Sequence, residues 1–99
     1  MEIPSLSKKE AEILRLLIAN DEMYGLQMVN ESDQLKRGTI YVTLARMAEK
    51  GYVESRDEEH PASDRPTRKL YKASGYGVRA YRSLEAARRS FIGGTAWAT

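Results

Sequence analysis

The first part of the chain repeats its apolar residues at the spacing of an α-helix. Ser7 and Glu10 have the spacing of a capping box, so a helix is predicted to begin there. Its apolar arc is too wide for packing on one side only: Ala11, Ile13, Leu14, Leu16, Leu17 and Ile18. We expect one stripe to enter the core and another helix, from a partner chain, to cover the rest, with Ile13, Leu16 and Leu17 at a dimer interface.

Two more helices are predicted before residue 51. Residues 20–22 break the first pattern, and a short helix then fits Tyr24 to about Asn30. A third helix is expected over Gly38–Lys50, because lysine suits the last turn of a helix and Gly51 suits the position just beyond it.

After Gly51 the pattern changes to that of strands and then back to that of a helix. Residues 52–56 and 68–73 are strand candidates, joined by a charged loop with two prolines into a hairpin. A last helix is predicted from about residue 75 to residue 92, ended by Gly93-Gly94. The tail beyond these glycines, which contains Trp97, is expected to be loose.

This order of elements is that of a winged helix-turn-helix. The predicted fold class is mainly α with a small antiparallel β-hairpin (α+β) and a C-terminal dimerisation helix. Residues 1–74 are assigned to the winged helix-turn-helix domain and residues 75–99 to the dimerisation helix and tail, in one compact unit.

Composition narrows the class of protein. The 99 residues, 41% of them apolar, suffice for one small domain, and association into an oligomer often stabilises such a domain. The chain has no cysteine, which excludes disulfides and thiolate metal sites. Its start lacks the features of a signal peptide, and no apolar run approaches the length of a membrane span. We expect a soluble cytoplasmic domain that does not associate with a membrane.

Positive charge is concentrated on one predicted helix. Residues 1–35 carry a net charge of −4 and residues 36–50 carry +3, whereas residues 51–73 balance and residues 74–99 carry +3. A clustered basic segment is the electrostatic footprint of a nucleic-acid binder, although the total charge of +2 alone would not indicate one.

The third helix combines a core stripe with side chains suited to a DNA major groove. At about 100° per residue, Ile40, Leu44 and Met47 fall together and are expected to pack on the first two helices. Cations, hydroxyls and a valine methyl lie elsewhere on the helix or just before it: Lys36, Arg37, Thr39, Val42, Thr43 and Arg46. Such groups can bond base edges, touch a thymine methyl or hold phosphates. We therefore expect double-stranded DNA as the partner.

Tyr41, on the flank of the same helix, admits two compatible interpretations. Its ring can pack half-buried with the hydroxyl at the rim, which is the commoner arrangement, or its hydroxyl can bond a phosphate. The pattern favours neither.

Several motifs, in the order in which they occur, resemble the PadR family of transcriptional regulators. Gly-Thr-Ile-Tyr at residues 38–41 matches the start of the family's recognition helix, and Glu-Lys-Gly at residues 49–51 matches its end. Tyr24-Gly25 matches the opening of helix two, and residues 65–77 are similar to the family's second wing strand and the turn after it. The likeness spans roughly residues 7–80.

The resemblance implies a homodimeric repressor that binds a near-palindromic operator and is often released by a small aromatic or cationic effector. It also implies a dimer made by the last helix, where we expect Tyr81, Leu84, Arg88 and Phe91 on one seam. That helix is short for the family, which disfavours an enclosed effector pocket, and no resident cofactor is expected.

The predicted wing departs from the pattern because its loop is acidic. Four carboxylates stand against one arginine between residues 57 and 65, and carboxylates repel phosphates. The tip is therefore expected to stay out of the minor groove. Three cations at the base of the hairpin are the expected contacts to the DNA backbone: Arg56, Arg68 and Lys69.

No catalytic or metal site is expected. His60 lies among carboxylates at a spacing that matches no common ligand motif, and no nucleophile is paired with a base. The rival to DNA reading is a winged helix used as a protein–protein interaction module, which would present an apolar face on the third helix. Val42 alone is apolar on that face, which disfavours the rival.

Overall fold

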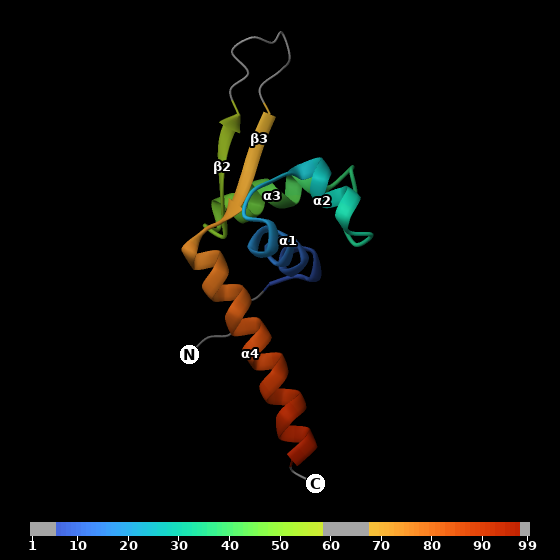
Figure 1. Ribbon diagram of the computed structural model, residues 1–99, viewed down its shortest axis with the longest axis vertical. Coiled ribbons are helices and arrows are strands. Elements are labelled where there is room, and N and C mark those ends of the chain that lie inside the picture. The colour runs from blue at the N-terminus through green and yellow to red at the C-terminus, as the bar shows by residue number, and fades with distance from the viewer. Residues whose placement is uncertain (1–5, 59–67, 98–99) are drawn as a thin grey trace.

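A computed structural model describes residues 6–58 and 68–97, with side chains described as far as residue 90 (Figure 1). The elements in chain order are α1 (Lys8–Asn20), β1 (Met23–Tyr24), α2 (Gly25–Glu31), α3 (Ile40–Glu49), β2 (Val53–Glu58), β3 (Arg68–Ala73) and α4 (Gly75–Trp97). The three strands form one antiparallel sheet in the order β1-β3-β2. The predicted fold class, mainly helical with a small antiparallel sheet, is confirmed.

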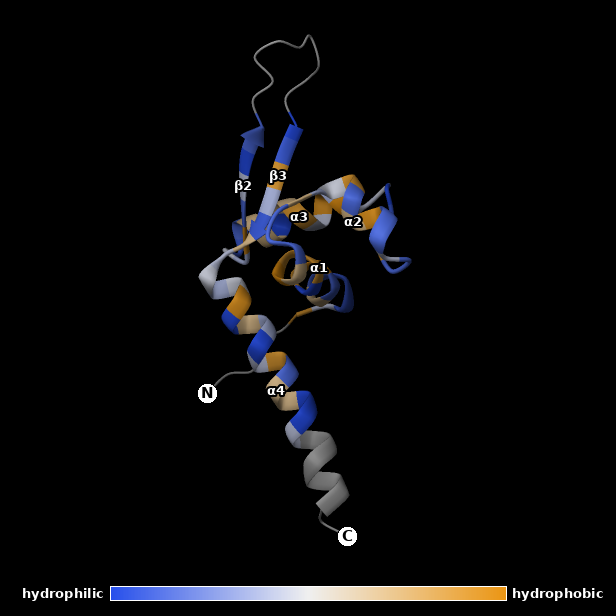
Figure 2. Cartoon of the chain, viewed as in Figure 1, coloured by the Kyte–Doolittle hydropathy of each residue, from blue (hydrophilic) through white to orange (hydrophobic). Residues whose placement is uncertain are grey.

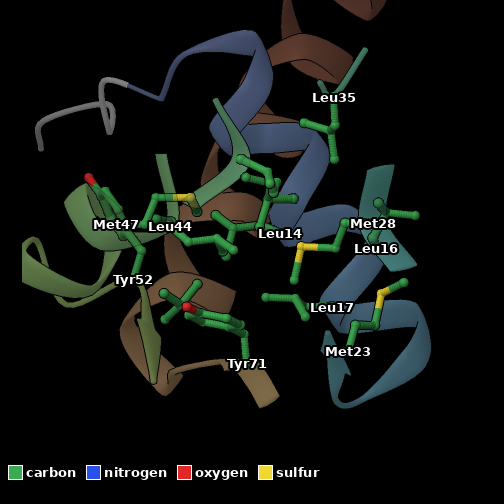
Figure 3. Packing of buried hydrophobic residues seen from close by; sticks show 14 residues of the cluster. Leu14, Leu16, Leu17, Met23, Met28, Leu35, Leu44, Met47, Tyr52 and Tyr71 are labelled. Atoms are coloured by element: carbon green, nitrogen blue, oxygen red, sulfur yellow. The ribbon is translucent and has the colours of Figure 1, made fainter. Parts of the chain in front are cut away.

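The core lies where α1, α2, α3 and the sheet meet (Figure 3). The predicted stripe of α3 is at its centre, since Ile40, Leu44 and Met47 are at most 1% exposed. Burial of each such side chain contributes about 1.5–3 kcal/mol. The stripe therefore holds the opposite side of α3 toward solvent.

The structure corrects the expectation for α1. Ile13, Leu16 and Leu17 are no more than 4% exposed within the single chain, so they leave no surface for a partner. The arc, apart from Ile18, which is 38% exposed, is covered by α3, α4 and β3 of the same chain. An apolar arc shows that a helix is covered, but it does not show which chain covers it.

A short strand, β1, was missed. Met23 pairs with Tyr71 and Tyr24 with Leu70, so α2 begins at Gly25 after the strand. Two residues are too few for a strand period to be visible in the sequence. The consequence is a three-stranded sheet instead of a lone hairpin.

Two helix boundaries also differ from expectation. The helix α3 begins at Ile40 instead of Gly38, because the backbone of Thr39, with a φ of −125°, lies outside the helical region, after a turn closed by the Thr39 amide on the carbonyl of Lys36 at 3.2 Å. The helix α4 continues through Gly93 and Gly94 as far as Trp97. Glycine inside a helix costs about 1 kcal/mol relative to alanine, but it keeps its hydrogen bonds and does not have to end the helix.

Hydrogen bonds and a ring stack join the start of α4 to the two residues just before β2. The hydroxyl of Ser74 donates to the carbonyl of Gly51 at 2.5 Å and accepts from the amide of Gly77 at 2.9 Å, and Gly51 has a φ of +82°. The rings of Tyr52 and Tyr76 stack with centroids 5.2 Å apart. From this joint α4 leads away from the wing, beyond the body of the molecule (Figure 1).

Two carboxylates of α1 are buried and paired. Glu12 accepts both guanidinium bonds of Arg15, at 2.7 and 2.9 Å, and the hydroxyl of Ser32 at the end of α2, at 2.5 Å. Glu10 closes the predicted capping box with Ser7 and binds Lys50 at 3.0 Å. The hydrogen bond from Arg15 first, then that from Ser32, holds the pKa of Glu12 below its usual value of 4.5. Burial raises the pKa of Glu10, but bonds from Ser7 and Lys50 outweigh burial and leave it lowered.

These depressed pKa values predict loss of stability in acid. Their contribution is complete above the unfolded value of about 4.5 and is lost as the pH falls through the lower folded values. Glu12→Gln should cost about 1–3 kcal/mol at neutral pH, because hydrogen bonds to a charged acceptor are removed. Urea unfolding between neutral and acidic pH checks this: the destabilisation caused by Glu12→Gln should shrink toward the acid end. The exposed Glu31→Gln is the control, and equal stability of the two variants at neutral pH would contradict the assignment.

Candidate nucleic-acid interface

The outward face of α3 is exposed along its whole length. Tyr41 is 49% and Val42 54% exposed, and Thr39 and Arg46 are exposed beside them, whereas Thr43 is half-buried. This face carries one cation, hydroxyls and a single aliphatic side chain, and Glu49 adds an exposed carboxylate at the C-terminal end of α3. It is the predicted set of groups for a major groove, and the structure brings these groups together on one side of the helix.

The turn before α3 presents two more cations. Leu35 is 3% exposed and anchors the turn in the core, while Lys36 and Arg37 are exposed just before the helix. Side chains at this end of a helix can reach phosphates on the edge of a groove entered by that helix. The turn thus extends the cationic surface beyond the helix itself.

The two threonines of this face differ in what they offer. Thr39 precedes the helix and makes no capping bond with its side chain, so its hydroxyl is open to a ligand. The hydroxyl of Thr43 donates to the carbonyl of Thr39 at 3.1 Å. Thr43 therefore offers a methyl group and an acceptor, and it is a weaker candidate for holding a phosphate than the sequence indicated.

Tyr41 packs on the first residue of α2. A Cβ added to Gly25 would lie 2.8 Å from Cε1 of the Tyr41 ring, so the ring lies directly on the glycine backbone. The structure shows the packing arrangement that was one of the two interpretations. With half of the residue exposed, a phosphate bond from its hydroxyl stays a prediction.

The register of the hairpin separates the three cations at its base. Side chains alternate between the two faces of a strand, and directly paired residues share a face. Lys69 lies on the same face as the buried Tyr71, which is the face of the core, whereas Arg68 shares the opposite face with Leu70 and its partner Arg56. The strand ends nearest the loop are hydrophilic (Figure 2).

Arg56 and Arg68 are engaged within the chain. Arg56 binds the carboxylate of Glu22 through two nitrogens at 2.8 and 2.9 Å, and this bond lowers the pKa of Glu22. The guanidinium of Arg68 lies 5.6 Å from the ring centroid of Tyr24, whose hydroxyl donates to Glu58. These contacts tie the hairpin to β1, so we assign both arginines to positioning the wing. Lys69 is the remaining candidate for a backbone contact at the base of the hairpin.

A second cationic feature, absent from the sequence predictions, lies beside α3. The N-terminal turn of α1 and one flank of α3 enclose a shallow groove, which we call the α1–α3 groove. Its lining comprises Ser7, Lys9, Glu10, Thr39, Val42, Thr43, Arg46 and Lys50. No signal in the sequence could place Lys9 in the same groove as Arg46, because the two residues are 37 positions apart and only tertiary packing brings the helices together.

Several residues singled out in the sequence lie outside the described part of the chain. They are the side chain of Phe91, predicted for the dimer seam, the side chain of Trp97, and the wing loop from residue 59 to residue 67 with His60, for which no metal role was expected. Within residues 6–58 and 68–97, no group of acidic or histidine side chains could hold a metal ion. None of the described helices is both long and apolar enough to cross a membrane.

The three-helix unit, the hairpin and the exposed cationic side of α3 define a winged helix-turn-helix protein. The family model "Transcriptional regulator PadR-like family" matches residues 13–83, and the chain belongs to this family. The family is one of transcriptional regulators and not of enzymes. No curated protein matches the chain.

Solved structures of regulators share the fold at low sequence identity. A PadR-like transcription factor from Bacteroides fragilis has a TM-score of 0.76 and 22% identity over 92% of this chain and 89% of that one. The PcaV transcriptional regulator of Streptomyces coelicolor, in complex with its natural ligand, has a TM-score of 0.69 and 20% identity, over 92% of this chain and 62% of PcaV. A mutant of MarR from E. coli, complexed with operator DNA, has a TM-score of 0.71 and 14% identity, over 92% of this chain and 61% of MarR.

Proposed function

We propose that the protein is a repressor that binds a near-palindromic operator as a homodimer, with α3 in the major groove of double-stranded DNA. The observation that carries this proposal is the division of α3: one stripe is buried in the core, and the opposite side exposes Thr39, Val42 and Arg46. A major groove of about 12 Å admits a helix presented in this way. The MarR structure with operator DNA, which has the same fold, supports the assignment.

We propose α4 as the element that forms the dimer. It has 23 residues, about 35 Å of helix, and much of that length lies beyond the body of the chain (Figure 1). Tyr81 and Leu84 are only half-buried by the single chain, and Arg88 bonds Glu85 of its own helix at 3.4 Å. Phe91 belongs to the proposed seam as well. A two-fold dimer of this kind would read two half-sites about one helical turn of DNA apart.

A salt titration of DNA binding tests the proposal. A dimer that uses Lys36, Arg37 and Lys69 of both protomers would neutralise about six phosphates, so log affinity should fall with log salt at a slope of about −5. Between about 50 and 200 mM salt the affinity should drop roughly 10³-fold. Fluorescence anisotropy with a duplex from the region upstream of the protein's own gene measures this salt dependence.

Two outcomes of this titration would contradict the proposal. Absence of binding at low salt would remove DNA as the partner and favour a winged helix that binds protein. A flat salt dependence would exclude the cations of α3 and the wing as phosphate contacts.

The effector implied by the family resemblance stays a prediction. The structure of PcaV was solved with its natural ligand, which is consistent with a small molecule acting on this fold. In this chain, a hollow between α1 and α4 is open and lined largely by charged groups, among them Lys8, Arg15 and Arg88. We therefore place any effector pocket at the assembled dimer and not within the described single chain.

A further inference from the structure

The α1–α3 groove carries a surplus of positive charge. Lys9, Arg46 and Lys50 line it, against the single carboxylate of Glu10. Of the described acidic side chains, none forms an ion pair with Lys9 or Arg46. The groove therefore presents two cations that have no counterion within the described part of the chain.

The carboxylate of Glu10 is turned away from any ligand. One of its oxygens accepts from the Ser7 amide at 2.9 Å and the other from the Nζ of Lys50 at 3.0 Å, and the residue is 6% exposed. Because Glu10 is buried and neutralised by Lys50, it does not repel an anion at the mouth of the groove. The charge that a ligand meets there is that of Lys9 and Arg46.

The position of the groove selects the kind of anion. A helix with its side chains is about 10–12 Å across, which fills a major groove about 12 Å wide, so an element packed beside such a helix meets the phosphate ridge and not the bases. On the side of α3 the lining includes three residues of the proposed DNA-reading side, Thr39, Val42 and Arg46, with Thr43 and Lys50 beside them. Lys9, on a second helix across the groove, lies where the bordering strand would run.

We propose that the α1–α3 groove seats a backbone phosphate of the strand that borders the major groove entered by α3, with Lys9 as the principal contact. The proposal rests on the proposed function and adds α1 to the DNA-binding surface. The Glu10 amide in the first turn of α1 is not available to the phosphate, because it donates to the Ser7 hydroxyl at 3.1 Å.

The chain supplies a matched control in the adjacent residue. Lys8 is also an exposed lysine in the first turn of α1, but it lines the hollow between α1 and α4, together with Arg15 and Tyr81. Lys8 and Lys9 thus have the same charge and nearly the same place in the sequence, and they face different sides of α1. A general effect of net charge would weaken DNA binding equally for both, whereas a phosphate seat involves Lys9 alone.

The experiment compares Lys9→Gln, Lys8→Gln and the unaltered full chain. Binding of a fluorescein-labelled mixed-sequence duplex of about 30 base pairs is measured by anisotropy between about 50 and 200 mM salt. Each phosphate that a variant no longer neutralises should make the slope of log affinity against log salt shallower by about 0.9. In a dimer Lys9→Gln removes one such contact from each protomer, so the slope should become shallower by about 1.8 and binding should weaken by roughly 60-fold near 0.1 M salt, while Lys8→Gln stays within about twofold of the unaltered chain. Thermal melts of the three proteins should coincide, since both lysines are exposed.

The outcomes separate this inference from the proposed function. If the unaltered chain binds with a steep salt slope and Lys9→Gln keeps that slope, the phosphate seat is wrong while DNA binding stands. If both lysine variants lose affinity equally, the effect is one of net charge and the seat is again wrong. If the unaltered chain does not bind the duplex at low salt, the proposed function is wrong, and so is the phosphate site in the α1–α3 groove.

Discussion

Gly77→Ala should destabilise the protein by about 3 kcal/mol or more. A Cβ at this position would lie 2.0 Å from the carbonyl oxygen of Tyr52 and 3.1 Å from Cδ2 of Leu14. The carbonyl cannot easily move aside, because it accepts from the amide of Ser74 at 3.0 Å. Alanine favours a helix by about 1 kcal/mol over glycine, but a backbone clash of this size outweighs that gain. Urea unfolding measures the change.

Gly75→Ala is the matched control for Gly77→Ala. Its added Cβ would meet only the end of the Arg79 side chain, at 3.4 Å, which can move away. Its effect should stay within about 0.5 kcal/mol. If the two alanine variants unfolded at the same urea concentration, the start of α4 would not pack against Tyr52 as described, and the direction in which α4 leaves the body would be wrong too.

Arg46→Ala should weaken binding to the preferred operator by about 1–3 kcal/mol and relax sequence preference at one position of each half-site. Arg46 is exposed on the side of α3 proposed to read DNA, where a guanidinium can bond a guanine edge with two hydrogen bonds. Selection of binding sites from a randomised duplex pool, followed by affinity measurements, would show the relaxed preference. Because Arg46 is exposed, Arg46→Ala should change the free energy of unfolding little.

Lys36→Ala provides the comparison for Arg46→Ala. Lys36 lies in the turn before α3 and is proposed to hold a phosphate in each protomer, so its removal should weaken all sequences alike and reduce the salt slope of the dimer by about 2. If both variants lowered affinity without any change in base preference, α3 would contact only the backbone. If neither had an effect, another element would be the reading helix.

Local signals in the sequence predicted most of the helical fold. The capping box of Ser7 and Glu10, the buried stripe of Ile40, Leu44 and Met47, and the strand period after Gly51 are each visible within a few turns of chain. The exposed cationic side of α3 follows from the same helical period. The path of α4 through Gly93 and Gly94 was missed because glycine lowers helix stability without forbidding a helix.

The sequence by itself thus determined the order of the helices, the hairpin, the family and the side of α3 that faces solvent, since all of these depend on periodicity and motifs along the chain. Only the tertiary structure decided that Leu17 is covered by its own chain, that Arg56 is bound to Glu22, and that Lys9 lies across a groove from Arg46. The physical reason is that a residue's type sets what it can bind, whereas the packing of distant segments sets what it meets.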